Sequence, residues 1–249
     1  MPTRSDEATA IRAAEGDAVK SEYVRRIFSE IAPSYDLLNH LLSLNIDRRW
    51  RRKAIAALHI ERRPAGRYLD LCAGTLDVST ELAAAKGFRG TVFGVDFAEP
   101  MLRAGRAKIG MHPGIVPIAA DALQLPLPSG SIDGAIVAFG IRNVAGLDES
   151  LREVRRVLAP DARFVILEFS TPRSSALNAV WQVYFQRVMP AIAGSISGHP
   201  SAYRYLPRSV ANFPVEEELA LRLEGAGFGD VTWQSLTLGV AAIHVGVAR

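Results

Sequence analysis

The chain has 249 residues, of which 49% are hydrophobic and 22% charged, with a net charge of +3 and one cysteine. That composition supplies a full hydrophobic core, excludes an internal disulfide and does not require a nucleic-acid partner, which usually needs a clustered basic face with stacking aromatics. No apolar run is long enough to cross a bilayer and no signal peptide is evident, so we expect a cytoplasmic protein.

The first 60 residues are expected to form a loose end followed by a helical cap. Residues 1–18 are polar and alanine-rich without apolar periodicity, which predicts disorder. Residues 19–60 show helical apolar spacing, interrupted at Pro33. Inside this cap, the basic run 47–53 surrounds Trp50. Such a run is usually a solvated helix face, and contact with anionic lipid headgroups is the alternative that stays open.

Residues 67–170 alternate between strand and helix patterns and are expected to form a cofactor-binding core. The expected strands and helices are 67–72, 77–86, 91–96, 98–109, 114–119, 131–139, 146–159 and 163–169, of which the second, fourth and seventh are helices. This alternation predicts an α/β fold with a parallel sheet and helices on both faces. Ligands of such sheets bind outside the carboxyl ends of the strands.

Residues 171–249 are expected to add substrate-side helices and closing strands to the same domain. An apolar helical stretch covers 176–194, and a loop rich in Gly, Ser and His follows it. A helix over 215–226 and two strands, 230–237 and 240–247, end the chain. We therefore expect one domain over residues 19–249.

A strand followed by a turn with a single glycine, Gly74, is the most informative feature of the core. Asp96 follows 22 residues later at the end of the next strand, where a carboxylate can accept hydrogen bonds from both hydroxyls of a ribose. Capping of the helix that starts after it is the competing interpretation. Dinucleotide sites usually need more glycines, whereas Leu76 replaces one here and Asp77 would repel a phosphate. We expect no positive φ at Leu76.

Further acids near the expected strand ends favour a cationic ligand without phosphate. Asp121, with the amide of Ala122, is placed to recognise an adenine, and Asp70 to hold the backbone of the turn, although both fit purely structural roles as well. S-adenosyl-L-methionine is a sulfonium with an amino group and a ribose diol, and it matches this chemistry. Cys72 has no activating neighbour in sequence, and no Cys/His cluster suggests a metal.

Five ordered stretches add a more specific signal. They are residues 24–39, 139–144, 167–172, 203–206 and 237–244. Together they resemble the ubiquinone/menaquinone biosynthesis C-methyltransferase family, of the demethylmenaquinone methyltransferase type. The resemblance implies a seven-stranded, Rossmann-like S-adenosylmethionine-dependent methyltransferase sheet whose last strand is antiparallel. It also implies C-methylation of a prenylated quinol, most directly demethylmenaquinol.

The same resemblance assigns cofactor contacts to Thr75, Asp96 and the pair Asp121 and Ala122. Ala138 stands where many members have a serine that touches the cofactor, and Ala73 and Leu76 replace residues that are commonly glycine.

Candidate catalytic residues come from three parts of the chain. Arg142 and Asn143 follow an apolar strand and a glycine, and Arg142 is expected to stabilise a substrate phenolate because arginine stays protonated. Tyr35, Asp36 and His244 are candidates for removing the substrate's proton. A lone histidine in a strand is more often a satisfied core residue.

Several alternatives stay open from the sequence. A dinucleotide-dependent oxidoreductase is opposed by the single-glycine turn. A non-catalytic quinone-binding protein with a decayed cofactor turn is favoured by Ala73, Leu76 and Ala138. Within the enzyme interpretation, a ubiquinone-pathway benzoquinol is the alternative substrate. Peripheral membrane contact and homo-oligomer formation are both compatible with the sequence.

Overall fold

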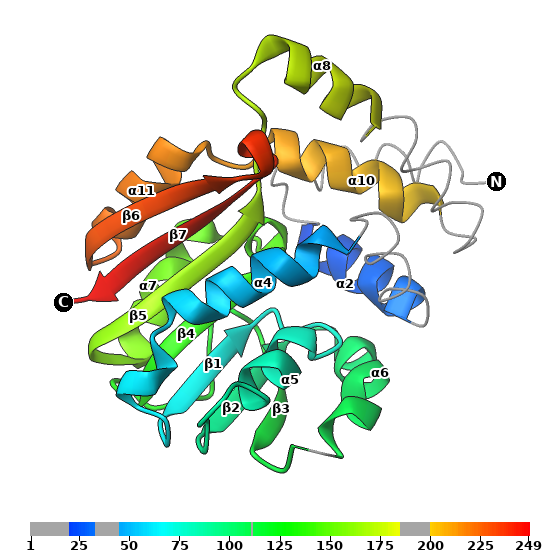
Figure 1. Cartoon of the computed structure of the whole chain (residues 1–249). Helices are drawn as coiled ribbons and strands as arrows, with labels where there is room; N and C mark the ends of the chain where they lie inside the picture. The colour runs from blue at the N-terminus through cyan, green and yellow to red at the C-terminus, as the bar shows by residue number, and fades with distance from the viewer. Residues whose placement is uncertain (1–19, 33–44, 111, 185–199) are drawn as a thin grey trace.

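A computed structural model of the chain describes residues 20–32, 45–110, 112–184 and 200–249. Its centre is a seven-stranded sheet in the order β3-β2-β1-β4-β5-β7-β6 (Figure 1). The strands are β1 Arg67–Leu71, β2 Thr91–Asp96, β3 Ile115–Ala119, β4 Ile132–Ala138, β5 Leu158–Phe169, β6 Phe228–Leu236 and β7 Ala241–Ala248. β7 is antiparallel to both of its neighbours, and the other pairs are parallel. The predicted fold class is confirmed.

Helices cover both faces of this sheet. The α-helices are α2 Lys20–Ile31, α4 Ile46–Ala57, α5 Asp77–Ala83, α6 Glu99–Ile109, α7 Leu147–Val157, α8 Ser175–Val183, α10 Pro200–Ala211 and α11 Glu216–Gly225. On one face, α4 and α5 bury side chains such as Ile55 and Leu82. On the other, α7 and α11 bury side chains such as Leu151 and Leu223. The sheet is therefore the middle of three layers.

The apolar face of α4 explains why this basic helix lies against the sheet. Trp50, Ala54 and Ile55 are buried, and the Trp50 ring packs against the rings of Phe139 and Phe169. The Trp50 indole Nε1 donates a hydrogen bond to Thr237 Oγ1 at 2.9 Å. Trp50 is thus part of the core and is not available to a lipid surface, whereas lipid contact of the basic run 47–53 through its other side chains stays a prediction.

The largest difference from the sequence expectation is α10. Residues 203–206 were expected to follow a loop, but they lie in the middle of a helix that starts at Pro200 and contains Pro207. A proline suits the first turn of a helix, but one in the interior weakens the sequence signal for it. α10 packs against α2, where the Tyr23 and Tyr205 rings lie 5.8 Å apart.

Smaller differences lie at element ends. β5 begins at Leu158, five residues earlier than expected, because its first residue pairs with β4 across an irregularity before the regular register starts at Arg163.

Within the described residues, no helix has the length and apolar content needed to cross a membrane. The predicted loose end at residues 1–18 lies outside the described residues, as does the whole of 185–199.

Candidate functional site

The carboxyl ends of β1, β2, β3 and β4 meet at one cleft of about 670 Å³, a volume that includes its opening to solvent. Its polar and backbone lining comes from the turns that follow these strands. Of the predicted site residues it includes Gly74, Asp96, Asp121, Ala122, Ala138 and Asn143. α2 contributes Ser21 and Phe28 to the same cleft, so the helical cap covers part of the opening. The structure therefore brings together residues from four strand ends that are far apart in sequence.

The turn after β1 is built from residues with positive φ. Cys72 has φ +54°, Gly74 +52° and Leu76 +66°. The expectation that Leu76 needs no positive φ is wrong. A leucine there costs about 1–2 kcal/mol, and burial of its whole side chain offsets that cost. Gly94 makes room for it, because a Cβ at that glycine would lie 2.6 Å from Leu76 Cδ2.

Asp96 fixes this turn and the start of the next helix at the same time. Its Oδ2 accepts a hydrogen bond from the Gly74 N–H at 2.8 Å, and its Oδ1 accepts one from the Ala98 N–H at 2.8 Å. Burial raises the pKa of this carboxyl to about 6, against the two backbone donors that lower it. Each oxygen has a second acceptor position, so the capping role and a ribose-binding role are compatible.

Asp70 and Thr75 lie behind the turn and are not part of the cleft lining. Asp70 Oδ2 accepts a hydrogen bond from Ser79 Oγ at 2.6 Å, and burial raises the pKa of Asp70 to about 7. Thr75 is buried beneath α6, where a Cβ at Gly105 would lie 2.3 Å from the Thr75 carbonyl oxygen. These two residues support the turn from below.

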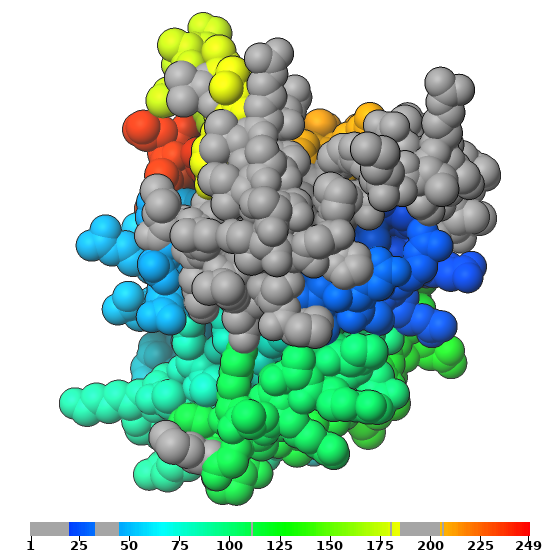
Figure 2. Space-filling view, turned by 90° about the vertical axis from the view of Figure 1, so that its right-hand side faces the viewer, coloured from blue at the N-terminus to red at the C-terminus, as the bar shows by residue number. Residues whose placement is uncertain are grey.

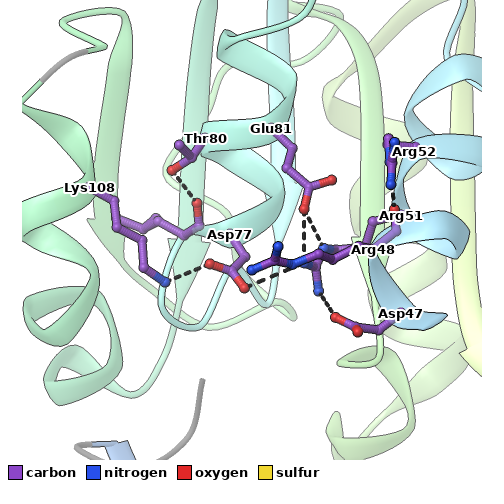
Figure 3. Close-up of polar contacts among 9 residues, drawn as sticks. Asp47, Arg48, Arg51, Arg52, Asp77, Thr80, Glu81 and Lys108 are labelled. Carbon is purple, nitrogen blue, oxygen red and sulfur yellow. Dashed lines mark hydrogen bonds and ion pairs between the residues drawn. The ribbon is translucent and has the colours of Figure 1, made fainter. Parts of the chain in front are cut away.

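Asp77, at the start of α5, is paired with two cations that lie on the side away from the cleft (Figure 3). Lys108 Nζ lies 2.6 Å from Asp77 Oδ1, and Arg51 Nη2 lies 3.7 Å from Oδ2. Arg51 is itself buried and also contacts Asp47 and Glu81. The Asp77 charge is therefore balanced outside the cleft, and the argument that it repels a phosphate there does not hold.

Asp121 and Ala122 form the wall of the cleft beyond β3. The Asp121 side chain is exposed, and its Oδ1 accepts a hydrogen bond from the Leu123 N–H at 2.9 Å. Ala122 is buried, with its side chain in the core beneath the cleft. Their positions suit a ligand that reaches across from Gly74.

The loop after β4 closes the opposite wall. Phe139 has φ +59°, and Gly140 lies directly against Cys72, where a Cβ would be 2.3 Å from Cys72 Cβ. Only glycine permits this approach. Burial, followed by the charges of Asp96 and Asp70, raises the pKa of the Cys72 thiol. A thiol that keeps its proton is a poor nucleophile, which agrees with the lack of an activating neighbour of Cys72 in the sequence.

Arg142 does not line this cleft, because its guanidinium forms a buried ion pair with Glu168 at the end of β5. Nη1 lies 2.6 Å from Glu168 Oε1 and also donates to the Phe139 carbonyl oxygen. The guanidinium lies over the Phe169 ring at 5.5 Å, while Nε is buried with no hydrogen-bond partner in the described part of the chain. Glu168 is a functional residue that the sequence analysis does not name. The signal that could have identified it is its place as the one charged residue in the apolar run 164–169.

Asn143 is the residue of this loop that lines the cleft. Its side chain is 8% exposed, and Oδ1 has no hydrogen-bond partner among the described residues. A buried amide oxygen without a donor costs free energy, so this atom is suited to a ligand donor.

His244 lies in β7, away from the cleft. It is 2% exposed, and its Nε2 lies 3.0 Å from the Glu216 carbonyl oxygen, with the ring stacked on Trp233. Burial lowers its pKa. These contacts are those of a core histidine. Tyr35 and Asp36 lie outside the described residues. The described residues contain no group of three or more His, Cys, Asp or Glu side chains that would hold a metal ion.

A series of aromatic rings leads from the cleft wall to the surface helix α8. Phe139 lies 4.7 Å from Phe169, Phe169 lies 6.3 Å from Trp181, and Trp181 lies 6.1 Å from Tyr184. Distances between centroids in this range are typical of packed aromatic pairs. The sequence pattern identified the apolar stretch around Trp181. Its contact with the cleft wall could not be predicted, because it runs through Phe169 and depends on how β5 packs.

The chain is similar to known proteins along almost its whole length. A sequence model of the family described as the ubiE/COQ5 methyltransferase family matches residues 17–248. A demethylmenaquinone methyltransferase from Thermus thermophilus is 50% identical over 224 residues, which are 88% of this chain and 99% of the relative. A ubiquinone/menaquinone biosynthesis C-methyltransferase from Geobacter sulfurreducens is 43% identical, over 91% of this chain and 89% of the relative.

The fold has solved neighbours with little sequence similarity. A crystal structure from Thermotoga maritima, described as a SAM-dependent methyltransferase and possible histamine N-methyltransferase, superposes with a TM-score of 0.64 at 18% identity. It covers 91% of this chain and 100% of that one. At this identity the likeness concerns the fold alone.

Proposed function

The chain belongs to the ubiE/COQ5 methyltransferase family, and from that membership we propose that its reaction converts demethylmenaquinol to menaquinol. It is an S-adenosylmethionine-dependent C-methyltransferase of quinone biosynthesis, as the motifs predicted. The relative from Thermus thermophilus is named for demethylmenaquinone alone, and this is why we choose that substrate over a benzoquinol. The oxidoreductase and the non-catalytic quinone binder are thereby set aside.

The cleft fits S-adenosylmethionine by the chemistry of its lining. Gly74 presents backbone at positive φ, where a ligand can approach closely. Asp96 and Asp121 supply carboxylates that suit a cationic ligand with hydroxyl and amino donors. Asn143 adds a buried acceptor that lacks a donor. We assign the ribose to Asp96, the adenine to Asp121 and Ala122, and close backbone contact to Gly74 and Ala138.

When bound, the cofactor supplies an electrophilic methyl group on its sulfonium. The chain's own task is to align the quinol ring, exclude water and remove a hydroxyl proton, because a ring carbon is a weak nucleophile until the neighbouring hydroxyl is a phenolate. Asn143 lies in the cleft wall and is placed to orient the ring. Tyr35 and Asp36 follow α2 in the sequence, and they stay our candidates for proton removal.

We reassign Arg142 from a direct role to a positioning role. Its guanidinium is paired with Glu168 and with the Phe139 carbonyl oxygen, and both contacts hold the loop that includes Asn143. A buried pair of this kind fixes a loop geometry more than it adds stability. Arg142 then acts on the reaction through the position of Asn143. His244 has no part in this proposal.

The aromatic series supports a substrate with a long apolar tail. A quinol ring held at Phe139 has Phe169, Trp181 and Tyr184 beside it in the direction of α8. Apolar and aromatic walls are what an isoprenoid chain needs. We therefore propose that the apolar stretch that starts at residue 176 lines the route of the tail as far as Tyr184; the residues of this stretch after Tyr184 lie outside the described residues.

The observation that supports the function most strongly is the cleft itself, where Gly74, Asp96 and Asn143 converge beside an aromatic path. Its test is mass spectrometry of the quinones from a strain that lacks this protein. The expected result is a naphthoquinone lighter by one methyl group, restored by the intact chain but not by Gly74→Val. Accumulation of a benzoquinone precursor instead would assign the ubiquinone pathway, and unchanged quinones would contradict the proposal.

A further inference from the structure

Four cations form an outward-facing row on α4. Arg48, Arg49, Arg52 and Lys53 are all exposed, and they recur at the one- and four-residue spacing that places side chains on one side of a helix. Trp50, Ala54 and Ile55 occupy the opposite side and are buried on the sheet. The row therefore points away from the protein core along the length of the helix.

None of these four side chains has a carboxylate partner within the described residues. The contrast with Arg51 on the same helix is informative, because Arg51 is buried and paired with Asp47, Asp77 and Glu81 (Figure 3). Other exposed arginines, such as Arg103, Arg173 and Arg249, are paired with acids. The α4 row is thus a local excess of positive charge that the fold leaves uncompensated.

An exposed apolar turn lies beside this row. The turn η5, Thr237–Gly239, joins β6 to β7, and Leu238 at its tip is 74% exposed with φ +60°. The hydrogen bond from Trp50 Nε1 to Thr237 Oγ1 ties the turn to α4. In Figure 1 α4 crosses in front of the sheet and the red turn lies at the upper end of β7, and in Figure 2 the blue side chains of α4 and the red turn project toward the same edge.

We propose that Arg48, Arg49, Arg52, Lys53 and Leu238 form a docking face for a bilayer that contains anionic phospholipid. Cations at the headgroup level and an apolar tip that enters the acyl boundary are the two components of peripheral membrane binding. α8, with the exposed side chains of Leu177 and Val183, stands next to η5 at the end of the aromatic series. The face therefore lies where a tail would leave the protein.

The choice of a lipid surface rests in part on the proposed function, because a polyprenylated quinol resides in a bilayer. It also rests on the composition of the face. Recognition of single-stranded nucleic acid uses exposed aromatic rings on which bases stack, and the one aromatic residue of α4, Trp50, is buried on the opposite side of the helix. A protruding leucine beside a row of cations suits an acyl layer under anionic headgroups.

Co-sedimentation with vesicles tests the proposal. The full chain is mixed with phosphatidylcholine vesicles with and without phosphatidylglycerol, and partitioning is compared with that of the variant R49Q/R52Q/K53Q. Arg48, which like Arg52 lines the groove beside Arg51, is left in place so that this variant and its control each remove three charges. Each charge near an anionic surface accounts for about fivefold in partitioning, so the triple variant should lose on the order of 100-fold on anionic vesicles. Higher salt should weaken binding of the intact chain.

A matched control removes the same charge elsewhere. The variant K86Q/R89Q/R106Q alters three exposed cations of the α5–β2 loop and α6, and it should bind anionic vesicles within a few-fold of the intact chain. Leu238→Asn, which tolerates a positive φ, should lower vesicle binding several-fold without changing the melting temperature.

Equal loss in the two triple variants would overturn the proposal, as would equal binding of the intact chain to neutral and anionic vesicles. Retention of an RNA oligonucleotide, lost in R49Q/R52Q/K53Q while vesicle binding is unchanged, would assign the face to nucleic acid. Methylation of a tailless naphthoquinol in solution separates the two proposals. If the intact chain and the variants all fail to methylate this quinol, the result counts against the proposed function. If the intact chain methylates it but does not bind vesicles, the result counts against the docking face alone.

Discussion

A single carboxylate, Asp96, connects the two strands that form the floor of the cleft. Its two oxygens accept N–H groups from Gly74 and Ala98, so the residue shapes the cleft before any ligand arrives. Sequence spacing indicated both the ribose role and the capping role as competing explanations. The geometry accommodates both, because each oxygen accepts more than one hydrogen bond.

The pKa of Asp96 makes cofactor affinity depend on pH. Since burial raises that pKa to about 6, the ionised carboxylate that accepts ribose hydroxyls predominates above this value and is lost below it. Affinity for S-adenosylmethionine should therefore fall as pH drops from about 7.5 to about 5. Calorimetric titration checks this. Asp96→Asn should bind more weakly and with a flatter profile, and Asp96→Ala should lose about 1.5–3 kcal/mol. An identical pH profile in Asp96→Asn would disprove the assignment.

Arg142 and Glu168 provide a second test at this scale. Arg142→Ala leaves a buried carboxylate without its partner, so it should destabilise the fold by about 3–5 kcal/mol. The double variant Arg142→Met with Glu168→Leu removes both charges and should recover most of the melting temperature. Turnover should stay low in the double variant, because the loop that includes Asn143 loses its brace. Full stability in Arg142→Ala with turnover alone reduced would show instead that Arg142 acts directly on the substrate.

At the scale of elements, regular strands and helices were predictable and special backbone positions were not. The parallel strands have continuous apolar runs, which fix their location within a few residues. α10 was missed because Pro207 weakens its pattern. The positive φ of Leu76 is held by burial against Gly94, and the Arg142–Glu168 pair depends on β4 lying beside β5. Contacts of this kind arise from tertiary packing and leave no periodic signal.

The contact between Gly140 and Cys72 joins two of these elements, and it is testable by exchange. Gly140→Ala places a Cβ 2.3 Å from Cys72 Cβ, so it should displace the cleft wall and weaken both cofactor binding and turnover. Cys72→Gly removes the opposing Cβ at a residue with φ +54°, where glycine is favoured. The double variant should therefore recover cofactor affinity relative to Gly140→Ala. If the double variant instead loses melting temperature and cofactor affinity by the sum of the two single variants, the two loops are not coupled.

At the scale of the whole molecule, the cofactor cleft, the aromatic series and the α4 face follow one another in space, from the interior of the protein to its surface. The cleft opens at the carboxyl ends of the strands, the rings lead to α8, and η5 and α4 lie at the surface next to it. The family motifs indicated the first of these parts, and the basic run 47–53 was a candidate for lipid contact from the sequence. The connection of the aromatic rings to the cleft depends on the packing of β5 and became visible only in the structure.

The aromatic series predicts a preference for prenylated substrates. With detergent-dispersed quinols, catalytic efficiency should be higher for a prenylated ring than for a tailless one, mainly through a lower KM, since the tail binds equally in the ground state and the transition state. Trp181→Ala should reduce this preference while leaving activity on the tailless quinol within a few-fold. Equal efficiency on both substrates in the intact chain would remove the basis for a tail route.

The most direct test of the central claim is methyl transfer by the purified protein. The chain is incubated with demethylmenaquinol and S-adenosylmethionine whose methyl group contains deuterium, and the quinone product is fragmented in a mass spectrometer. We predict one labelled methyl group bonded to a ring carbon, with Gly74→Val producing none. A folded protein that binds the cofactor but yields no labelled quinone, or one that labels a ring oxygen, would contradict the account.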